Sequence, residues 1–204
     1  MKLAQVYSHL NGLEFMLVHK PELWKEIQDV IAQTDAELYR TKESKEQGRT
    51  GDMLYSPADL NRAMKKKLDA LNWKESRVGY CVTADLNTSR EIAQLSDRNE
   101  QKRIIEARGF QSYSTYNQID FVKEGVAIEV QFGKYFSVQY DLHVKHTFFY
   151  GRGDIDVGVE IIPTHKMMSE MSSGIAWYEN ELTNIVREGR SNPSVSIILI
   201  RIEP

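Results

Sequence analysis

The sequence predicts a β-sheet with helices packed on it, an α/β or α+β fold. Segments with helical apolar spacing and short, strand-like apolar segments follow one another in mixed order along the chain. The chain has 204 residues, of which 41% are hydrophobic and 27% charged, as is ordinary for a soluble globular protein. Because this length can bury a real core, we expect one domain over residues 1–204, with room for a subdomain.

Two helices and a loop are predicted in the first third of the chain. Residues 21–33 begin with Pro21 at a first helical position, and their apolar residues recur at helical spacing. Residues 56–73 begin with a Ser cap and a Pro and continue as an amphipathic helix. Residues 41–52 between them are polar and contain two glycines, so we expect a mobile loop there.

Further strands and helices are predicted on both sides of a central hairpin. Residues 77–84 are expected to form a strand, and the charged residues 97–109 form a short helix that ends at Gly109. After the hairpin, the pattern predicts in order a largely buried helix over 137–150, a strand over 154–163, a capped helix over 172–189 and a closing strand over 194–202.

Residues 116–132, YNQIDFVKEGVAIEVQF, have the pattern of a tight β-hairpin. A turn centred on Glu124 and Gly125 fits, because Gly accepts the positive φ of such turns, although Glu is not the favoured first residue. Residues whose numbers sum to 249 then face each other, which makes one face wholly apolar and the other wholly polar. The facing pairs are Gln118 with Gln131, Ile119 with Val130, Asp120 with Glu129, and Phe121 with Ile128.

The facing carboxylates of Asp120 and Glu129 need a compensating charge. Their Cβ atoms would stand roughly 5 Å apart, and two carboxylates so placed share either a proton or a cation. Mg²⁺ takes oxygen ligands, often one or two carboxylates with waters and phosphate oxygens, and the carbonyl of Val130 could add another. A solvated face of an edge hairpin, on which the pair is incidental, is the alternative that the pattern leaves open.

Motifs in the hairpin and along the chain are similar to those of a known family. IDF…AIEVQFGKY resembles the catalytic hairpin of type II restriction endonucleases of the BglII and BstYI kind, the BstYI kind more closely. Similar motifs are VYSHLNGLE at 6–14, TKESKE at 41–46, YSPADLN at 55–61, WKESR at 73–77, IDVGVEI at 155–161 and MSSGI at 171–175. The resemblance covers nearly the whole chain and implies an α/β restriction-endonuclease-like fold, with a central mixed β-sheet flanked by helices.

That family belongs to the PD-(D/E)xK nucleases, whose signature this chain alters twice. Ile119 stands in place of the Pro, and Gln131 stands in place of the Lys, as it does in the BglII and BstYI enzymes. The resemblance implies that Asp120 and Glu129 hold Mg²⁺. Because a neutral amide cannot act as a general base at pH 7, the metal would activate the attacking water and Gln131 would orient it. Ser76 aligns with a further active-site position, an Asn in BglII, and is a candidate to hold a water.

The resemblance further implies a homodimer that cuts both strands of double-stranded DNA at a palindromic, GATC-centred site. Ser172, Ser173 and Lys134 align with base-contacting segments at the start of a late helix and just after the hairpin. Lys134 and Ser173 stand where BglII has Asn, and their chemistry favours a relaxed outer purine, RGATCY, cut before the G to leave 5′ GATC overhangs. Three alternatives stay open: AGATCT-only specificity, another metal nuclease acting in repair or on branched DNA, and DNA binding without catalysis.

Other polar residues give weaker signals. His143 and His146 are spaced i, i+3, but no third ligand accompanies them at zinc-like spacing, so a structural or dimer-contact role is expected. Residues 65–67 are three lysines of the kind that usually form a solvated helix face. GRGD at 151–154 lacks the Lys and Ser/Thr of a phosphate-binding loop and predicts a turn.

The composition fits a cytoplasmic protein. The single cysteine, Cys81, excludes an internal disulfide, fits a reducing compartment and is expected to pack in the core. No apolar run approaches the length of a membrane span, and the N-terminus lacks the apolar core of a signal peptide. The formal net charge of −3 does not exclude DNA as a partner, because metal-binding carboxylates can offset a basic cleft.

Overall fold

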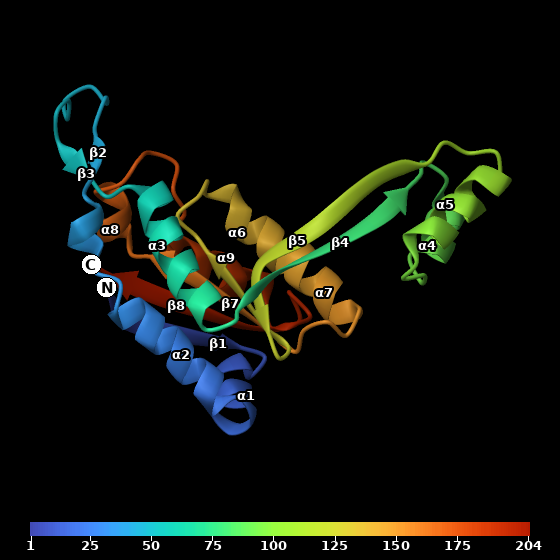
Figure 1. The fold of residues 1–204 in the computed structure, drawn as a ribbon, viewed down its shortest axis with the longest axis horizontal. Coiled ribbons are helices and arrows are strands. Elements are labelled where there is room, and N and C mark those ends of the chain that lie inside the picture. The colour runs from blue at the N-terminus through green and yellow to red at the C-terminus, as the bar shows by residue number, and fades with distance from the viewer. The chain divides into compact units, whose positions relative to one another are not determined.

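A six-stranded mixed β-sheet organises the chain, in the order β1-β8-β7-β6-β5-β4 (Figure 1). The central β7 runs parallel to β6 and β8, whereas β1 is antiparallel to β8 and β5 is antiparallel to β6. The strands are β1 Lys2–His9, β4 Lys74–Val82, β5 Tyr113–Lys123, β6 Val126–Val130, β7 Val157–Pro163 and β8 Ser196–Glu203.

The computed structural model describes residues 1–204 and divides into two compact units. The main unit contains residues 1–75 and 119–204, and the small unit contains residues 76–118. The expected single domain with a subdomain stays a prediction.

Helices and a short β-ribbon complete the main unit. The ribbon pairs β2 (Lys42–Glu43) with β3 (Met53–Leu54) inside and just after the predicted loop. The helices are α1 Gly12–His19, α2 Pro21–Ala32, the 3-10 helix η1 Ala36–Tyr39, α3 Pro57–Ala70, α6 Phe136–Tyr140, the π-helix η2 Asp141–His146, α7 Thr147–Gly151, α8 His165–Ser169 and α9 Tyr178–Glu188.

Apolar side chains cover both faces of the strands in the main unit. Alternate residues of a strand point to opposite faces, and β8 shows this clearly: Ile198 packs in one buried cluster, whereas Ile197 packs in another. The first cluster contains the apolar sides of α2 and α3, including Trp24 and Leu60. The second contains apolar residues of α6, η2 and α9, including Leu142. The strands of the main unit are therefore sandwiched between two helical layers.

The small unit contains α4 (Leu86–Ile92) and α5 (Arg98–Ala107) beside parts of β4 and β5. Its apolar cluster is small and joins Cys81 to Ile92 and Ile105, which confirms the predicted core packing of the cysteine. The buried Gln101 amide links these elements, since its oxygen accepts from the Cys81 N–H at 2.8 Å and its nitrogen donates to Leu95 O at 2.7 Å.

Most predicted elements form with small shifts of their ends. The helices predicted over 21–33 and 56–73 are α2 and α3, and the Ser56 hydroxyl caps α3 by accepting from the Asp59 N–H. The helix predicted over 97–109 is α5, and Gly109 follows it with a φ of +78°. β1, α1, α4 and α8 were not predicted. No helix in the structure is both long and apolar enough to cross a membrane.

One predicted helix start is wrong. The helix expected over 172–189 begins only at Tyr178, whereas Gly189 does follow its end. Residues before it cannot continue a helix because Gly174 adopts a φ of +82° and Ile175 forms an isolated antiparallel bridge with Lys134. The mobility expected of residues 41–52 stays a prediction, although the segment carries β2 and a 2.8 Å hydrogen bond from Ser44 N to Asp52 O.

Candidate active site

The hairpin turn is built as predicted. Glu124 and Gly125 have φ values of +47° and +80°, both in the left-handed region that such turns require. A Cβ at Gly125 would also clash with the carboxylate of Asp156. The paired residues of β5 and β6 are Phe121 with Ile128, Val122 with Ala127 and Lys123 with Val126, so the predicted register is confirmed at these pairs.

Glu129 lies on β6 and is buried, with only 2% of its surface exposed. It does not lie on a solvated face, whereas Asp120 on β5 is exposed. Lys145 reaches Glu129 from η2, with Nζ 3.0 Å from Oε1, and the same ammonium lies 2.7 Å from Oδ1 of Asp141. The glutamate is therefore held by a cation from an element that follows it in sequence.

Gln131 is also buried and fixed by two acceptors. Its Nε2 donates to Oδ2 of Asp141 at 2.5 Å and to Oε2 of Glu160 at 2.8 Å. Glu160 lies on β7, where it pairs in parallel register with Glu129. Its second oxygen is 2.8 Å from Nε2 of His146, which is fully buried.

These side chains form one network, which we call the buried polar cluster: Glu129, Gln131, Asp141, Lys145, His146 and Glu160. Burial raises the pKa of Glu129 well above its usual value, and the charges of Asp141 and Asp120 raise it further. Burial likewise raises the pKa of Asp141 and that of Glu160. The cluster thus holds more carboxyl groups than its single ammonium can balance.

The donor set fits a hard divalent cation, although it is not a complete metal site. No three carboxylate, imidazole or thiol groups converge to hold a metal by themselves. Mg²⁺, however, is often bound by one or two carboxylates, with waters and substrate phosphates completing its coordination. An exposed Asp120 and a charge-rich cluster at Glu129 meet that requirement. Val130 directly follows Glu129 on β6, and its carbonyl accepts from Phe132 N at 3.2 Å.

The predicted DNA-contacting residues belong to two segments that lie side by side. Lys134 is exposed and bridges to Ile175, and Tyr135 N donates to Gly174 O at 2.7 Å. The Ser173 N–H donates to Glu46 at 3.3 Å. Ser172 Oγ accepts from Lys42, so the β2 region contacts the same segment. Ser76 begins the small unit on β4, and its role stays a prediction.

The sequence interpretation missed Asp141, Lys145 and Glu160. Asp141 and Lys145 are spaced i, i+4 in a segment expected to be a buried helix, and an ion pair on such a helix was a usable signal. Glu160 stands alone in an apolar strand, which also indicates a buried carboxyl with a partner. His146 lies within the cluster, 2.8 Å from Glu160, whereas His143 lies 2.8 Å from Glu188, so the two imidazoles contact different carboxylates, and their expected structural or dimer-contact role stays a prediction.

Comparisons with known proteins agree with this architecture. A family model described as "Restriction endonuclease BglII/BglIII" matches residues 4–202. The structure is similar to restriction endonuclease BglII complexed with a DNA 16-mer, with a TM-score of 0.68 and 20% identity over 100% of this chain and 78% of that chain. Free BglII gives a TM-score of 0.58 and 18% identity over 100% and 80% of the chains. No curated protein sequence matches. The predicted fold class is confirmed.

Proposed function

Because this chain belongs to the BglII/BglIII restriction endonuclease family and is thus a type II site-specific nuclease, we propose how it cuts DNA and where. It hydrolyses one phosphodiester in each strand of a palindromic, GATC-centred duplex and depends on Mg²⁺. The observation that supports this most directly is the placement of Glu129 and Gln131 together in the buried polar cluster at the end of β6.

Asp120 and Glu129, with the carbonyl of Val130, are the residues that would hold the metal. When bound, a divalent cation polarises the scissile phosphate and lowers the pKa of water. Gln131 would orient the attacking water. Both N–H bonds of its side-chain amide donate to Asp141 and Glu160, so Oε1 is the amide atom that can accept a hydrogen bond from that water. A neutral amide aligns a water without removing its proton.

Lys145 is a positioning residue in this scheme. Gln131 supplies no positive charge at the signature position, and Lys145 provides an ammonium from η2 instead, 3.0 Å from Glu129. Burial lowers the pKa of Lys145, but the carboxylates of Glu129 and Asp141 outweigh this effect and the net pKa is raised. The ammonium therefore stays charged and fixes the Glu129 side chain. A π-helical segment is a frequent feature of functional sites, and η2 carries this lysine.

Cleavage of both strands requires two copies of this site. One site cuts one strand, and a two-fold homodimer matches the symmetry of a palindrome. We therefore infer a homodimer bound to double-stranded DNA. We also propose that the protein acts in the cytoplasm.

The outer base pair is read with relaxed specificity, RGATCY. Asn pairs with adenine by accepting from N6 and donating to N7, which penalises guanine. Lys134 only donates, and both purines offer N7 as an acceptor. A serine hydroxyl such as Ser173 donates to guanine O6 or accepts from adenine N6. The adjacency of these two segments supports their joint role in reading one base pair.

The metal assignment is tested by Asp120→Ala and Glu129→Ala. Metal catalysis is worth several kcal/mol, so each variant should lose cleavage by about a thousandfold or more. Binding to a GATC duplex should stay measurable by gel shift, because the base contacts are intact. Ala variants that cut at near wild-type rate in Mg²⁺ would show that the assignment is wrong, and binding by the wild type without cleavage in excess Mg²⁺ would favour a non-catalytic protein.

The target is tested by digesting plasmids and sequencing the ends. We expect discrete fragments with 5′ GATC overhangs from both AGATCT and GGATCC. Lys134→Asn combined with Ser173→Asn should shift preference toward AGATCT. Wild-type refusal of GGATCC, or equal cleavage of both sites by the double variant, contradicts relaxed reading. Cleavage confined to branched DNA would instead indicate a repair-type nuclease.

A further inference from the structure

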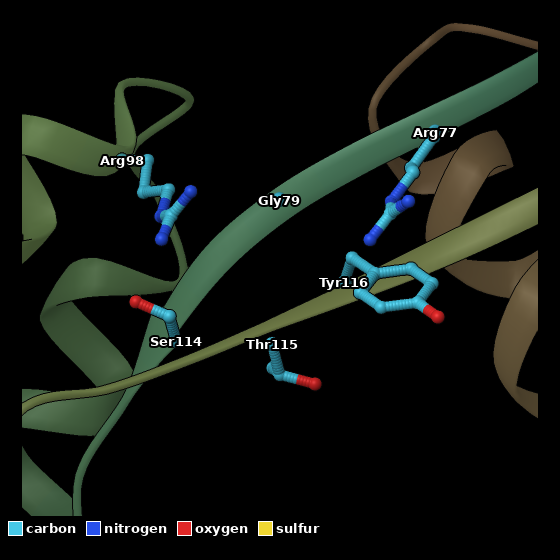
Figure 2. A pocket seen from close by; sticks show the side chains of 6 residues that line it. All are labelled: Arg77, Gly79, Arg98, Ser114, Thr115 and Tyr116. Carbon is cyan, nitrogen blue, oxygen red and sulfur yellow. The ribbon is translucent and has the colours of Figure 1, made fainter.

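The small unit contains an open cavity of about 510 Å³. We call it the arginine pocket, and its lining residues are Arg77, Gly79, Arg98, Ser114, Thr115 and Tyr116 (Figure 2). Every one of them lies within residues 76–118, so the pocket belongs wholly to this unit. None of its lining residues belongs to the buried polar cluster described above.

A stacking contact with Tyr116 holds Arg77, one of the two arginines of the pocket. The guanidinium carbon of Arg77 on β4 lies 3.6 Å from the ring centroid of Tyr116 on β5, and the tyrosine is 49% exposed. A stacked guanidinium keeps its N–H donors at the ring's rim, where they can still reach a ligand. Arg77 is therefore ordered before a ligand binds.

A glycine brings the second cation close. Figure 2 shows Gly79 on β4 between Arg77 and Arg98. A Cβ at Gly79 would lie 3.6 Å from both Cδ and Nη1 of Arg98, so the side chain of the first residue of α5 rests against this strand. Two guanidiniums from different elements thus line one cavity, together with the hydroxyls of Ser114 and Thr115.

The positive charge of the pocket is uncompensated. No acidic side chain lines it, and neither guanidinium forms an ion pair within the small unit. Arg108 of the same unit, in contrast, pairs with Glu91. Residues 76–118 contain six Arg and Lys against five Asp and Glu, so their formal charge is +1, whereas the whole chain carries −3.

These donors suit a phosphodiester. Guanidinium groups bind phosphate oxygens through paired N–H bonds, and hydroxyls donate to the same kind of acceptor. We propose that the arginine pocket binds a backbone phosphate of the double-stranded DNA and adds affinity that is independent of base sequence. The proposal rests on the proposed function, which supplies DNA as the ligand.

The test compares Arg77→Gln, Arg98→Gln and their combination with Arg90→Gln. Arg90 is an exposed arginine of α4 outside the pocket, so its variant makes the same charge change as either single pocket variant, in the same unit. Affinity for a cognate duplex and for a duplex without GATC is measured without Mg²⁺ over a range of KCl concentrations. The double variant should bind both duplexes roughly tenfold more weakly, and its log–log salt slope should fall by about 1, as for one lost phosphate contact. Arg90→Gln should match the wild type.

A second pair of variants tests the stacking. Tyr116→Leu should weaken binding in the same sequence-independent way, whereas Tyr116→Phe keeps the ring and should bind like the wild type. Thermal unfolding of each variant checks that it is folded.

Three outcomes overturn the proposal. They are equal salt slopes for the double variant and Arg90→Gln, weaker binding of the cognate duplex alone, and a change of oligomeric state on sedimentation, which would assign the pocket to a second copy of the chain. The proposed function fails separately, if the wild type binds duplexes but cleaves no plasmid in Mg²⁺.

Discussion

The buried polar cluster and the arginine pocket place charge in opposite ways. In the cluster, Glu129 and Gln131 are nearly inaccessible, and every charged group contacts another member. In the pocket, Arg77 and Arg98 are exposed and lack carboxylate partners within their unit. A buried charge is costly unless it is paired, whereas an exposed guanidinium costs little to leave unpaired. The first arrangement suits a rigid catalytic site, and the second suits an exposed anion-binding site.

The largest expected effect on stability comes from removing the single cation of the cluster. Lys145→Met leaves Glu129 and Asp141 without their partner. Since its side chain is 20% exposed, we expect the low end of the cost of breaking a buried pair, about 3 kcal/mol of unfolding free energy. Cleavage should fall about 10–100-fold, as for other groups that orient a metal ligand.

Urea unfolding and a Mg²⁺ titration of the cleavage rate measure both effects. Lys66→Met, at an exposed position of α3, is the control and should stay within about 0.5 kcal/mol of the wild type. A purely structural role for Lys145 would lower stability and leave the Mg²⁺ dependence of the rate unchanged.

A pair of glycine substitutions compares packing in the two regions. A Cβ at Gly158 on β7 would lie 2.6 Å from Nδ1 of His146 and 2.7 Å from Cδ1 of Ile197. Both distances are too short for a normal contact, so the neighbouring side chains or the strand would have to shift. Gly158→Ala should therefore cost about 1–3 kcal/mol. Gly79→Ala in the arginine pocket meets Arg98 only at ordinary contact distance and should cost much less. Equal melting temperatures for the two variants would contradict this difference in packing.

The buried His146 should make the stability of the protein fall in acid. Burial lowers the pKa of His146 to about 3, below its usual 6.5. The neutral imidazole thus contributes stability that is fully present above pH 6.5 and is lost as the pH falls toward 3. The raised pKa of Glu160 has the opposite effect on stability as the pH falls, so a His146 variant is compared with the wild type at each pH.

His146→Gln should lose less unfolding free energy than the wild type over this acid range. Chemical denaturation at several pH values measures the difference. An unchanged pH dependence would show that another group carries the acid sensitivity.

The smallest expected effect is on the stability of the arginine pocket. Arg77→Gln and Arg98→Gln remove charges that pair with no carboxylate in their unit, so the free energy of unfolding should change by less than about 0.5 kcal/mol. Differential scanning calorimetry checks this. A large destabilisation would mean that these arginines hold the small unit together instead of serving a ligand.

The sequence by itself determined the local structure of this protein. The Glu124–Gly125 turn fixes which hairpin residues face each other, and a two-residue alternation then orders both strands, so the register at Phe121 and Ile128 was predictable. Helical apolar spacing and the Ser56 cap likewise determined α2 and α3. Such features depend on neighbours within a few residues. The same local logic failed at residues 172–177, where pairing with Lys134 overrides a helix start.

The tertiary structure alone decided what surrounds the carboxylates. Glu160 meets Gln131 because β7 lies parallel beside β6, and Lys145 meets Glu129 because η2 packs over the sheet. The arginine pocket similarly needs β4, β5 and the first turn of α5 to come together. These contacts join residues far apart in the chain, and burial then shifts the pKa of each group. Neither the partners nor the desolvation that shifts those pKa values is encoded in any local pattern, because both arise only when separate elements pack.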